Sequence, residues 1–303
     1  MQENKGEKTM LEQFRANCID VAVNEPMSKH TSFQIGGTAD YFVCPANREQ
    51  LKTAVEIIKK AGVPYFVLGN GSNLLVSDEG YRGVMLHPIM DTLEVTGTKL
   101  VCGSGVLLSR ASREAAKHSL SGLEFASGIP GSMGGAVRMN AGAYGGEMSD
   151  VVKKTTYFDP DTMEFYVTQE HDFSYRHSMF CDQPGYIICE TELELTAGDQ
   201  TAILTQMDEL AKKRRDKQPV SLPSAGSTFK RPQGDYAAAL IDRAGLRGLQ
   251  VGGAQVSEKH TGFIVNLGGA TACDVKTLME QVQREVYRQF GVQLEKEICI
   301  IGE

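Results

Sequence analysis

Hydrophobic and polar positions in the first 90 residues predict a strand, a helix and a second strand in succession. Residues 39–44 form a short apolar and aromatic run that is typical of a strand. Apolar residues then recur at helical spacing from Leu51 to Ala61, with Asn47 placed as an N-cap and Gly62 as the end of the helix. Residues 63–68 are apolar again. The pattern therefore predicts a β–α–β arrangement.

From about residue 91 the pattern changes to short β-type runs around one amphipathic helix. The helix has an apolar stripe formed by Val106, Leu107, Ala111 and Ala115. An Asp-Pro-Asp turn at residues 159–161 joins two of the runs into a hairpin. Strands are expected at residues 92–96, 100–102, 151–158, 165–167 and 187–195.

The last hundred residues alternate helices and strands once more. An amphipathic helix follows Gly198 and ends in the basic run of residues 212–215, where cations suit a helix C-terminus. A loop rich in Pro, Ser and Gly spans residues 219–226. Beyond it we expect a helix at 236–244, strands at 251–256 and 263–267, a long helix at 275–290 and a last strand at 292–301.

These elements predict an α+β protein in three parts. The expected parts are residues 1–90, residues 91–199 and a smaller αββαβ domain at residues 200–303. The chain has 303 residues, of which 41% are hydrophobic and 23% charged, an ordinary balance for a globular protein with a substantial core.

Charge and cysteine usage exclude several classes of protein. The net charge is −7 and the one dense basic run lies on a helix, so we expect no nucleic-acid partner. No stretch approaches the roughly 18 apolar residues of a membrane span, and the polar first 13 residues are unlike a signal peptide. Seven scattered cysteines without a CxxC pair indicate reduced thiols in the cytoplasm, with no metal site.

The 32 glycines are the abnormal feature of the composition. The first glycine loop, Gly69-Asn70-Gly71-Ser72-Asn73-Leu74, follows an apolar strand. Leu74 occupies the third glycine position of a dinucleotide-binding fingerprint, and a short strand rather than a helix is expected after it. Taken alone, this loop is equally well explained as a turn.

A second glycine-rich block spans residues 125–146 and contains the runs Ser127–Ala136 and Asn140–Gly146. So many small residues let backbone N–H groups approach a ligand without interference from side chains. A pyrophosphate is the natural ligand, because amides in a turn or at a helix N-terminus can stabilise its charge. The two blocks together favour a nucleotide cofactor over a merely glycine-rich core.

Seven motifs follow one another in a fixed order along the chain. They are Asn24-Glu-Pro-Met-Ser28, His30-Thr-Ser-Phe33 with Ile35-Gly-Gly37, the loop of residues 69–74, Gly128-Ile-Pro-Gly131 with Asn140-Ala-Gly142, Tyr175-Arg176-His-Ser178, Pro223-Ser-Ala-Gly-Ser227-Thr-Phe-Lys230 and Leu294-Glu-Lys-Glu297. Through them nearly the whole chain resembles the UDP-N-acetylenolpyruvoylglucosamine reductases, the MurB family of flavoenzymes.

The resemblance implies an FAD-binding fold of the vanillyl-alcohol-oxidase (PCMH) type, in two subdomains, with a C-terminal substrate domain whose last strand returns to the active site. It also implies the cofactors FAD and NADPH and the reduction of UDP-N-acetylglucosamine enolpyruvate to UDP-N-acetylmuramate, a step of peptidoglycan synthesis and so of cell-wall biogenesis, cell shape and division. The enzyme would be a cytoplasmic monomer. Only 51 residues separate Arg176 from Ser227, as in the second type of the family, which lacks a substrate-capping insertion.

Three residues match the family's catalytic positions. Arg176 suits the stabilisation of an enolate-like intermediate, because its planar fork stays charged and can hold a carboxylate. The resemblance makes Ser227 the proton donor, although a serine in such a loop is ordinarily turn chemistry. It makes Glu297 the assisting carboxylate, ahead of Glu295 on the same face of the expected last strand. Without the resemblance, these two acids would simply form a solvated edge.

The remaining site residues are expected around these three. The candidates for substrate binding are Tyr175, Lys230, Arg231 and Lys259, although the three cations could equally be solvated charges. His260 is a candidate site residue or a structural one. Cys299 stands where the family commonly has Arg, so any contact of that side chain with the flavin differs here. The cofactor-binding candidates are Gly69, Asn70, Gly71, Ser72, Asn73, Leu74, Ser127, Gly128, Ile129, Gly131, Ser132, Gly134, Gly135, Asn140 and Gly142.

Three alternatives remain open at this level. Another flavin oxidoreductase of the same fold would not need Arg176, Ser227 and Glu297 together. A non-catalytic nucleotide-binding protein would keep the fold and bind its ligand without turnover. A structural α+β protein with glycine-rich turns would bind no flavin.

Overall fold

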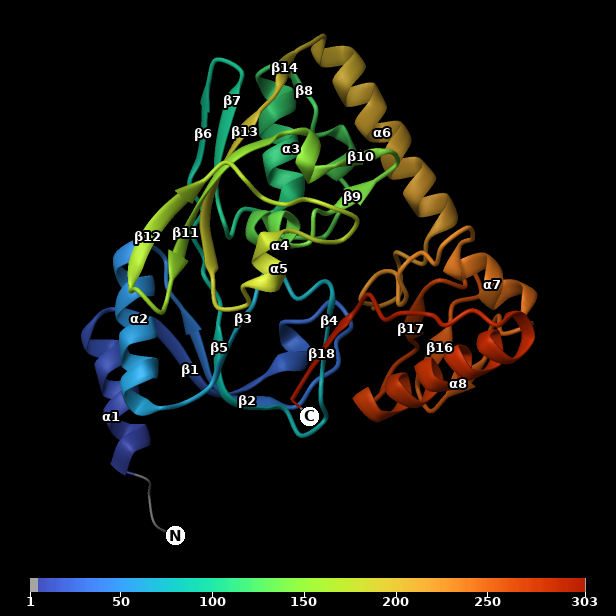
Figure 1. Cartoon of the computed structure of the whole chain (residues 1–303), viewed down its shortest axis with the longest axis horizontal. Helices are drawn as coiled ribbons and strands as arrows, with labels where there is room; N and C mark the ends of the chain where they lie inside the picture. Colours follow the sequence, from blue (N-terminus) through green and yellow to red (C-terminus); the bar gives the residue numbers. More distant parts are fainter. Residues whose placement is uncertain (1–4, 303) are drawn as a thin grey trace. The chain divides into compact units, whose positions relative to one another are not determined.

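The computed structural model describes residues 5–302, so the first four residues of the expected N-terminal part lie outside the description (Figure 1). The chain divides into two compact units, each assembled from separate segments. Unit 1 comprises Met1–Val23, Tyr41–Asn70 and Gly83–Lys212, and unit 2 comprises Asn24–Asp40, Gly71–Arg82 and Lys213–Glu303. The boundaries expected at residues 90 and 199 stay a prediction.

A four-stranded sheet and two helices are built from the first 86 residues. The helices, α1 (Lys5–Ala16) and α2 (Arg48–Ala61), lie side by side (Figure 1). Asn47 Oδ1 accepts the N–H of Gln50 and Gly62 closes α2 at φ 65°, as the sequence predicts. The sheet order is β1 (Asp20–Pro26), β2 (Thr38–Cys44), β5 (Tyr81–Leu86) and β3 (Tyr65–Val67), with β3 parallel to β5.

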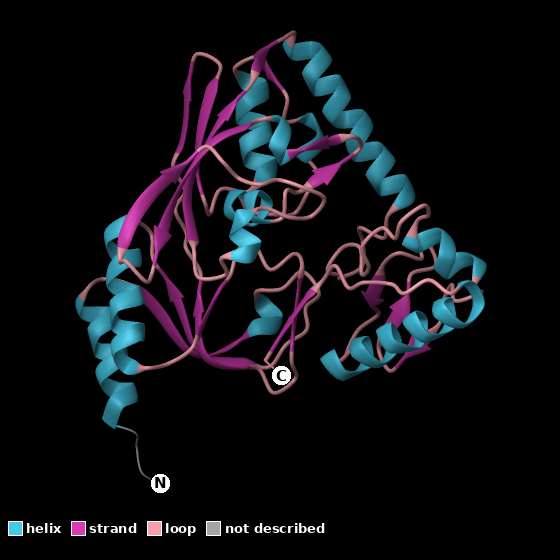
Figure 2. Cartoon of the chain, in the orientation of Figure 1, coloured by secondary structure: helices cyan, strands magenta, loops and turns pink. Residues whose placement is uncertain are grey.

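An antiparallel five-stranded sheet lies within unit 1 (Figure 2). Its order is β12 (Glu164–Thr168), β11 (Val152–Asp159), β13 (Ile187–Glu194), β7 (Lys99–Gly103) and β6 (Leu93–Thr96). The helices α3 (Leu108–Lys117) and α4 (Met133–Arg138) share one hydrophobic core with this sheet, centred on fully buried Leu100, Leu108 and Leu193.

Short elements complete unit 1. They are β8 (Leu120–Ser121) paired with β14 (Thr196–Ala197), β9 (Gly142–Ala143) paired with β10 (Gly146–Glu147), α5 (Met179–Asp182), and the 3₁₀ turns Glu124–Ala126 and Met148–Asp150. A further 3₁₀ turn, Met27–Lys29, belongs to unit 2. The long helix α6 (Gln200–Lys217) carries the basic run at its C-terminal end.

Unit 2 packs two helices on a three-stranded sheet. The sheet is β15 (Gln250–Val251), β16 (Ala254–Val256) and β17 (Ile264–Asn266), and the helices are α7 (Ala237–Arg243) and α8 (Ala272–Phe290). The last strand, β18 (Cys299–Ile301), pairs in parallel with β4 (Leu74–Val76), which follows the first glycine loop. The end of the chain therefore returns to a segment about 220 residues earlier within the same unit.

Most predicted elements are confirmed, and two predictions are corrected. The last strand is short: of residues 292–301, only Cys299–Ile301 form a regular strand, and Lys296 makes a single bridge to Phe229. The single strand expected at 251–256 is split by a turn in which Gly252 has φ 53°. The pattern also missed α1, β1 and β5. Among the described residues, no helix has the length and apolarity needed to span a membrane.

Candidate active site

The first glycine loop has a backbone that requires glycine and leaves amides unpaired. Gly71 has φ 60°, and a Cβ at this position would collide with the backbone carbonyl of His30. Among the described residues, the structure records no acceptor for the backbone N–H groups of residues 69–72. Successive free amides around a positive-φ residue are typical of an anion-binding turn.

The second glycine block lies against the first. Asn70 Nδ2 donates to the carbonyl of Pro130 at 2.7 Å, and a Cβ at Gly69 would approach Ser132 Oγ to 2.8 Å. Residues 127–129 form a compact turn, in which Ile129 N–H donates to Ala126 O. The absence of a side chain at residue 69 thus lets the two segments pack together beside Ser132 and Gly135.

Ser132 supplies a polar group without a partner at this junction. It is the N-cap residue of α4, but its Oγ caps no amide and is buried without a hydrogen bond among the described residues. The first amides of α4 are in use, since Met133 N–H donates to Val106 O and Gly134 N–H donates to Ser104 O. Within unit 1, the hydroxyl of Ser132 and the amides of Gly69 and Asn70 therefore fit the phosphate-bearing part of FAD better than the α4 N-terminus does.

Tyr175 and Arg176 form the tip of a tight two-residue turn in unit 1. Ser174 and His177 close the turn through two backbone hydrogen bonds of 3.1 Å. Arg176 has φ 56°, a strained conformation for a residue with a long side chain. Its guanidinium lies 5.1 Å from the centre of the Tyr175 ring, and Nη2 donates to Gly142 O at 3.4 Å. The sequence-predicted Arg176 is thus joined to the second glycine block.

Asn140 is placed differently from a ligand-binding residue. Its side chain is fully buried, with Oδ1 accepting the N–H of Ser149 and Nδ2 donating to Ser174 O. It shares this neighbourhood with Gly142, whose Cβ would meet the backbone of the hairpin β9–β10. No signal in the sequence indicated the contact between Asn140 and the Arg176 turn.

Ser227 and Glu297 are brought together in unit 2 by backbone pairing. Ser227 pairs with Phe263, and its neighbour Thr228 accepts the N–H of Glu297 at 2.9 Å. Gly226, immediately before the serine, turns the chain at φ 76°. Both Ser227 and Glu297 are half-buried, so each side chain keeps some exposed surface. Two residues 70 positions apart in sequence thus lie on adjacent segments.

Asn73, in the first glycine loop, contacts the segment that carries Glu297. Asn73 Nδ2 donates to the carbonyl of Glu297 at 3.1 Å, and Asn73 O accepts the N–H of Cys299 at 3.0 Å. Leu74 is in register with Cys299 in the β4–β18 pair. Within unit 2, Asn73 and Leu74 therefore meet the segment that carries Glu297, although residues 292–298 form no regular strand.

Glu295 has a different environment from Glu297. Its carboxylate is exposed and lies 3.6 Å from Lys230 Nζ, and Lys230 N–H donates to Glu295 O. Arg231 places its guanidinium 4.1 Å from the centre of the exposed Tyr236 ring. Lys230 and Arg231 thus already interact with side chains of their own unit, in pairs that solvent screens.

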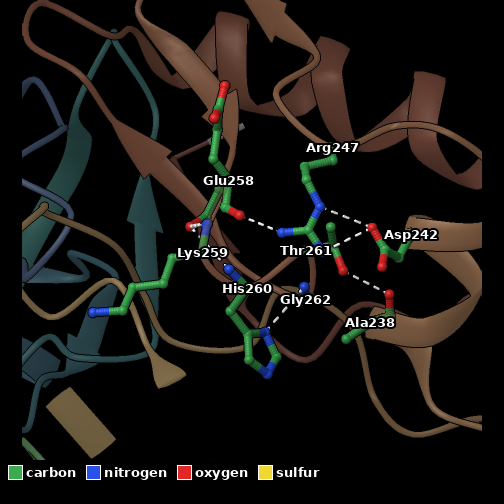
Figure 3. Close-up of polar contacts among 9 residues, drawn as sticks. Ala238, Asp242, Arg247, Glu258, Lys259, His260, Thr261 and Gly262 are labelled. Carbon is green, nitrogen blue, oxygen red and sulfur yellow. Dashed lines mark hydrogen bonds and ion pairs between the residues drawn. The ribbon is translucent and has the colours of Figure 1, made fainter. Parts of the chain in front are cut away.

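Lys259 and His260 belong to a tight loop before β17 (Figure 3). Ser257 Oγ accepts the backbone N–H groups of both residues, and Lys259 Nζ donates to the carbonyl of Arg215 near the end of α6. His260 Nδ1 accepts the N–H of Gly262, and burial lowers the pKa of the ring. In this structure Lys259 stabilises a helix C-terminus, and His260 supports the segment that pairs with Ser227.

Two families of known proteins match the chain. Residues 39–164 match the FAD binding domain family, and residues 218–301 match the C-terminal domain of UDP-N-acetylenolpyruvoylglucosamine reductase. The UDP-N-acetylenolpyruvoylglucosamine reductase of Clostridioides difficile is 48% identical over 287 residues, 94% of each chain. That of Caldanaerobacter subterraneus is 47% identical over 93% of each chain.

The chain belongs to the UDP-N-acetylenolpyruvoylglucosamine reductase family. A solved member, from Thermus caldophilus, superposes with a TM-score of 0.79 at 37% identity, covering 94% of this chain and 99% of the other. The family assignment, the enzyme class of FAD-dependent oxidoreductase and the expected FAD-binding fold with its C-terminal domain are confirmed. The roles of individual residues in this reductase stay predictions.

Proposed function

We propose that this chain reduces UDP-N-acetylglucosamine enolpyruvate to UDP-N-acetylmuramate, with NADPH as electron donor and FAD as carrier, as a cytoplasmic monomer in peptidoglycan precursor synthesis. The observation that carries the proposal is a pair of hydrogen bonds in unit 2, one from the Asn73 side chain to Glu297 O and one from Glu297 N–H to Thr228 O, which joins the end of the first glycine loop to the segments of Glu297 and Ser227. The network supports the proposal, because it brings residues 73 and 74 of the first glycine loop beside the Glu297 segment within unit 2.

The residues present fit FAD. Within unit 1, the amides of Gly69 and Asn70 and the hydroxyl of Ser132, which has no partner among the described residues, would bind its phosphates. Gly69 and Gly135 keep the surroundings of that hydroxyl clear of side chains. When bound and reduced, FAD supplies the hydride that adds to the methylene carbon of the enolpyruvyl group.

Arg176 stabilises the negative charge that develops in the enolpyruvyl carboxylate as its methylene carbon is reduced. The guanidinium is permanently charged and is held toward Gly142 O and the Tyr175 ring before substrate binds. A charge that is already in position costs no reorganisation during the reaction, which is the basis of electrostatic catalysis. Tyr175, which is half-exposed at the same turn, contacts the substrate.

Ser227 donates the proton that completes the reduction at the carbon next to the carboxylate. Gly226 turns the chain immediately before Ser227, and the bridge between Ser227 and Phe263 fixes the segment that carries the hydroxyl. Glu297 assists by polarising the intermediate from the adjacent segment, which is anchored to Thr228 O. The anionic substrate is attracted by three cations of unit 2, Lys230, Arg231 and Lys259. Each either keeps its present contact, with Glu295, Tyr236 or Arg215 O respectively, or exchanges that contact for a phosphate group of the substrate.

Substrate-dependent oxidation of NADPH tests the proposal, with the product identified by its mass. The purified protein should consume one NADPH for each UDP-N-acetylmuramate formed and elute as a monomer in light scattering. A yellow protein that reduces other acceptors but ignores this substrate would be another flavin oxidoreductase of the same fold. A protein that binds the ligands without turnover would be a non-catalytic relative.

A further inference from the structure

Asn140 has no surface with which to bind a cofactor. Its side chain is fully buried and both ends of its amide have protein partners: Ser149 N–H at 2.9 Å and Ser174 O at 3.1 Å. The backbone of Asn140 has φ 44°, a conformation that Asn tolerates better than most residues. The residue at position 140 must therefore adopt a positive φ, and its side chain must both accept and donate a hydrogen bond.

The Nδ2 bond of Asn140 reaches the base of the turn that carries Arg176. Ser174 begins that turn and is paired with His177, so fixing Ser174 O fixes where the tip begins. The guanidinium of Arg176 donates to Gly142 O, only two residues beyond Asn140. Residues 140–142 therefore hold the turn at two points: Asn140 binds Ser174 at its base, and Gly142 O accepts from Arg176 at its tip.

Two further contacts hold the flanks of the turn but not its base. Ser178 Oγ donates to Arg138 O at 2.7 Å, and Met179 N–H donates to His171 O at 2.7 Å. Neither contact involves Ser174, whose carbonyl accepts from Asn140 Nδ2, and Arg176 at the tip has φ 56°. Strain at a functional residue persists only where the surroundings over-determine it, and the Asn140 amide supplies one of those constraints.

We propose that Asn140 is a positioning residue, which holds the Tyr175–Arg176 turn in its reactive geometry and makes no contact with the flavin. The inference rests on the proposed function, because it assumes that Arg176 stabilises the reaction intermediate. Loss of the amide leaves Arg176 charged and present but removes one of the constraints on its position. A displacement of about 1 Å in such a group can cost about 10²-fold in rate.

The test compares Asn140→Gly with Ser112→Ala in the holoenzyme. Glycine keeps the positive φ and removes both amide contacts. Ser112→Ala is a matched control, since it also deletes one buried bond from a side chain to a carbonyl, that of Ser112 Oγ to Leu123 O, in the same unit. We expect Asn140→Gly to keep its flavin and its rate of reduction by NADPH, while reoxidation by the enolpyruvyl substrate slows by about 10²-fold with KM changed much less.

Asn140→Asp provides a second, pH-dependent readout if the glycine variant is unstable. The ionised carboxylate keeps the acceptor for Ser149 N–H but cannot donate to Ser174 O. Burial raises the pKa of such a carboxyl, and its protonated form regains the donor. Reoxidation by this variant should therefore accelerate, relative to the wild type, as the pH is lowered.

Hydrogen exchange of the amides of Ser174 and His177 gives a readout that is independent of turnover. These amides should exchange faster in Asn140→Gly and at the wild-type rate in Ser112→Ala. Loss of flavin as the sole defect, or wild-type reoxidation and exchange in both Asn140 variants, would overturn the inference. The variant Arg176→Ala distinguishes failure of the proposed function from failure of this inference. If its flavin is reoxidised at the normal rate, the proposed role of Arg176 fails. If its reoxidation is slow while that of Asn140→Gly is normal, only the positioning role of Asn140 is refuted.

Discussion

At the scale of single residues, the hydrogen-bond partners of a polar side chain decide whether it can meet a ligand. Asn140 and Ser132 both come from the second glycine block, but Asn140 has both amide ends paired and Ser132 Oγ has no partner among the described residues. The sequence predicted the same role for both. Only packing separates them, because burial decides which of two small polar residues can meet a ligand.

Ser227→Ala tests the proton donor at this scale. Removal of a positioned general acid typically costs about 10²–10⁴-fold in rate. We expect turnover to fall within that range, while flavin content and the rate of flavin reduction by NADPH stay normal. Rapid-mixing absorbance measures both half-reactions. Unchanged reoxidation would mean that another group supplies the proton.

Gly71→Ala tests the first glycine loop. The variant would strain φ 60° and drive a methyl group into the carbonyl of His30. Gly97→Ala is the matched control, since Gly97 has φ 62° and a Cβ added there would meet no atom within 4 Å. We expect Gly97→Ala to lose about 1 kcal/mol of stability, and Gly71→Ala to lose more and to bind FAD more weakly. Equal losses in denaturant unfolding and equal FAD titrations would show that the His30 contact does not matter.

At the scale of elements, the hydrophobic pattern predicted helices well where caps were local. Helix α2 has Asn47 at one end and Gly62 at the other, so both limits are visible in the sequence. The last strand was predicted too long because residues 292–298 alternate like a strand but have only one bridge to a neighbour. Periodicity reports which face is buried, whereas a ladder needs a partner strand that the local sequence does not show.

Helix α8 illustrates a cap that comes from far away. Thr271 and Asp274 form a local capping box, and Asp78, almost 200 residues earlier, accepts the N–H groups of Ala272 and Cys273 at 2.7 and 2.9 Å. We expect Asp78→Ala to lower the free energy of unfolding by about 1 kcal/mol, the usual cost of losing an N-terminal cap. Glu79→Ala, at the neighbouring exposed acid, is the control. Urea unfolding should separate the two variants, and identical midpoints would contradict the role of Asp78.

At the scale of the whole molecule, unit 2 is assembled from three separate stretches of chain. Ser32 Oγ donates to Ser224 O at 2.6 Å and Asn266 Nδ2 donates to Phe33 O at 3.1 Å, so the early segments are fixed to the C-terminal part. The sequence alone could not predict this, because no local pattern links residues about 200 positions apart. The family motifs near residues 24–37 and 71–74 thus serve the same unit as Ser227 and Glu297.

Stability should fall in mild acid because of the buried His171 and the partly buried His260. Burial lowers the pKa of both His171 and His260 below 6.5. The unfolded chain therefore takes up protons first, and the contribution of each neutral ring, complete above pH 6.5, is lost as the pH falls through the lowered pKa. His171→Gln should reduce the slope of unfolding free energy against pH by up to about 1.4 kcal/mol per unit in this range. Urea unfolding at pH 5 to 7.5 measures it, and an unchanged slope would exclude His171 as the cause.

The proposed reductase activity is tested most directly by the flavin spectrum of the purified protein, followed in the absence of oxygen. NADPH should bleach the flavin absorbance, and UDP-N-acetylglucosamine enolpyruvate should then restore it rapidly and in stoichiometric amount. That result would establish both half-reactions in this protein. A flavin that bleaches with NADPH and stays bleached when this substrate is added would contradict the proposed function.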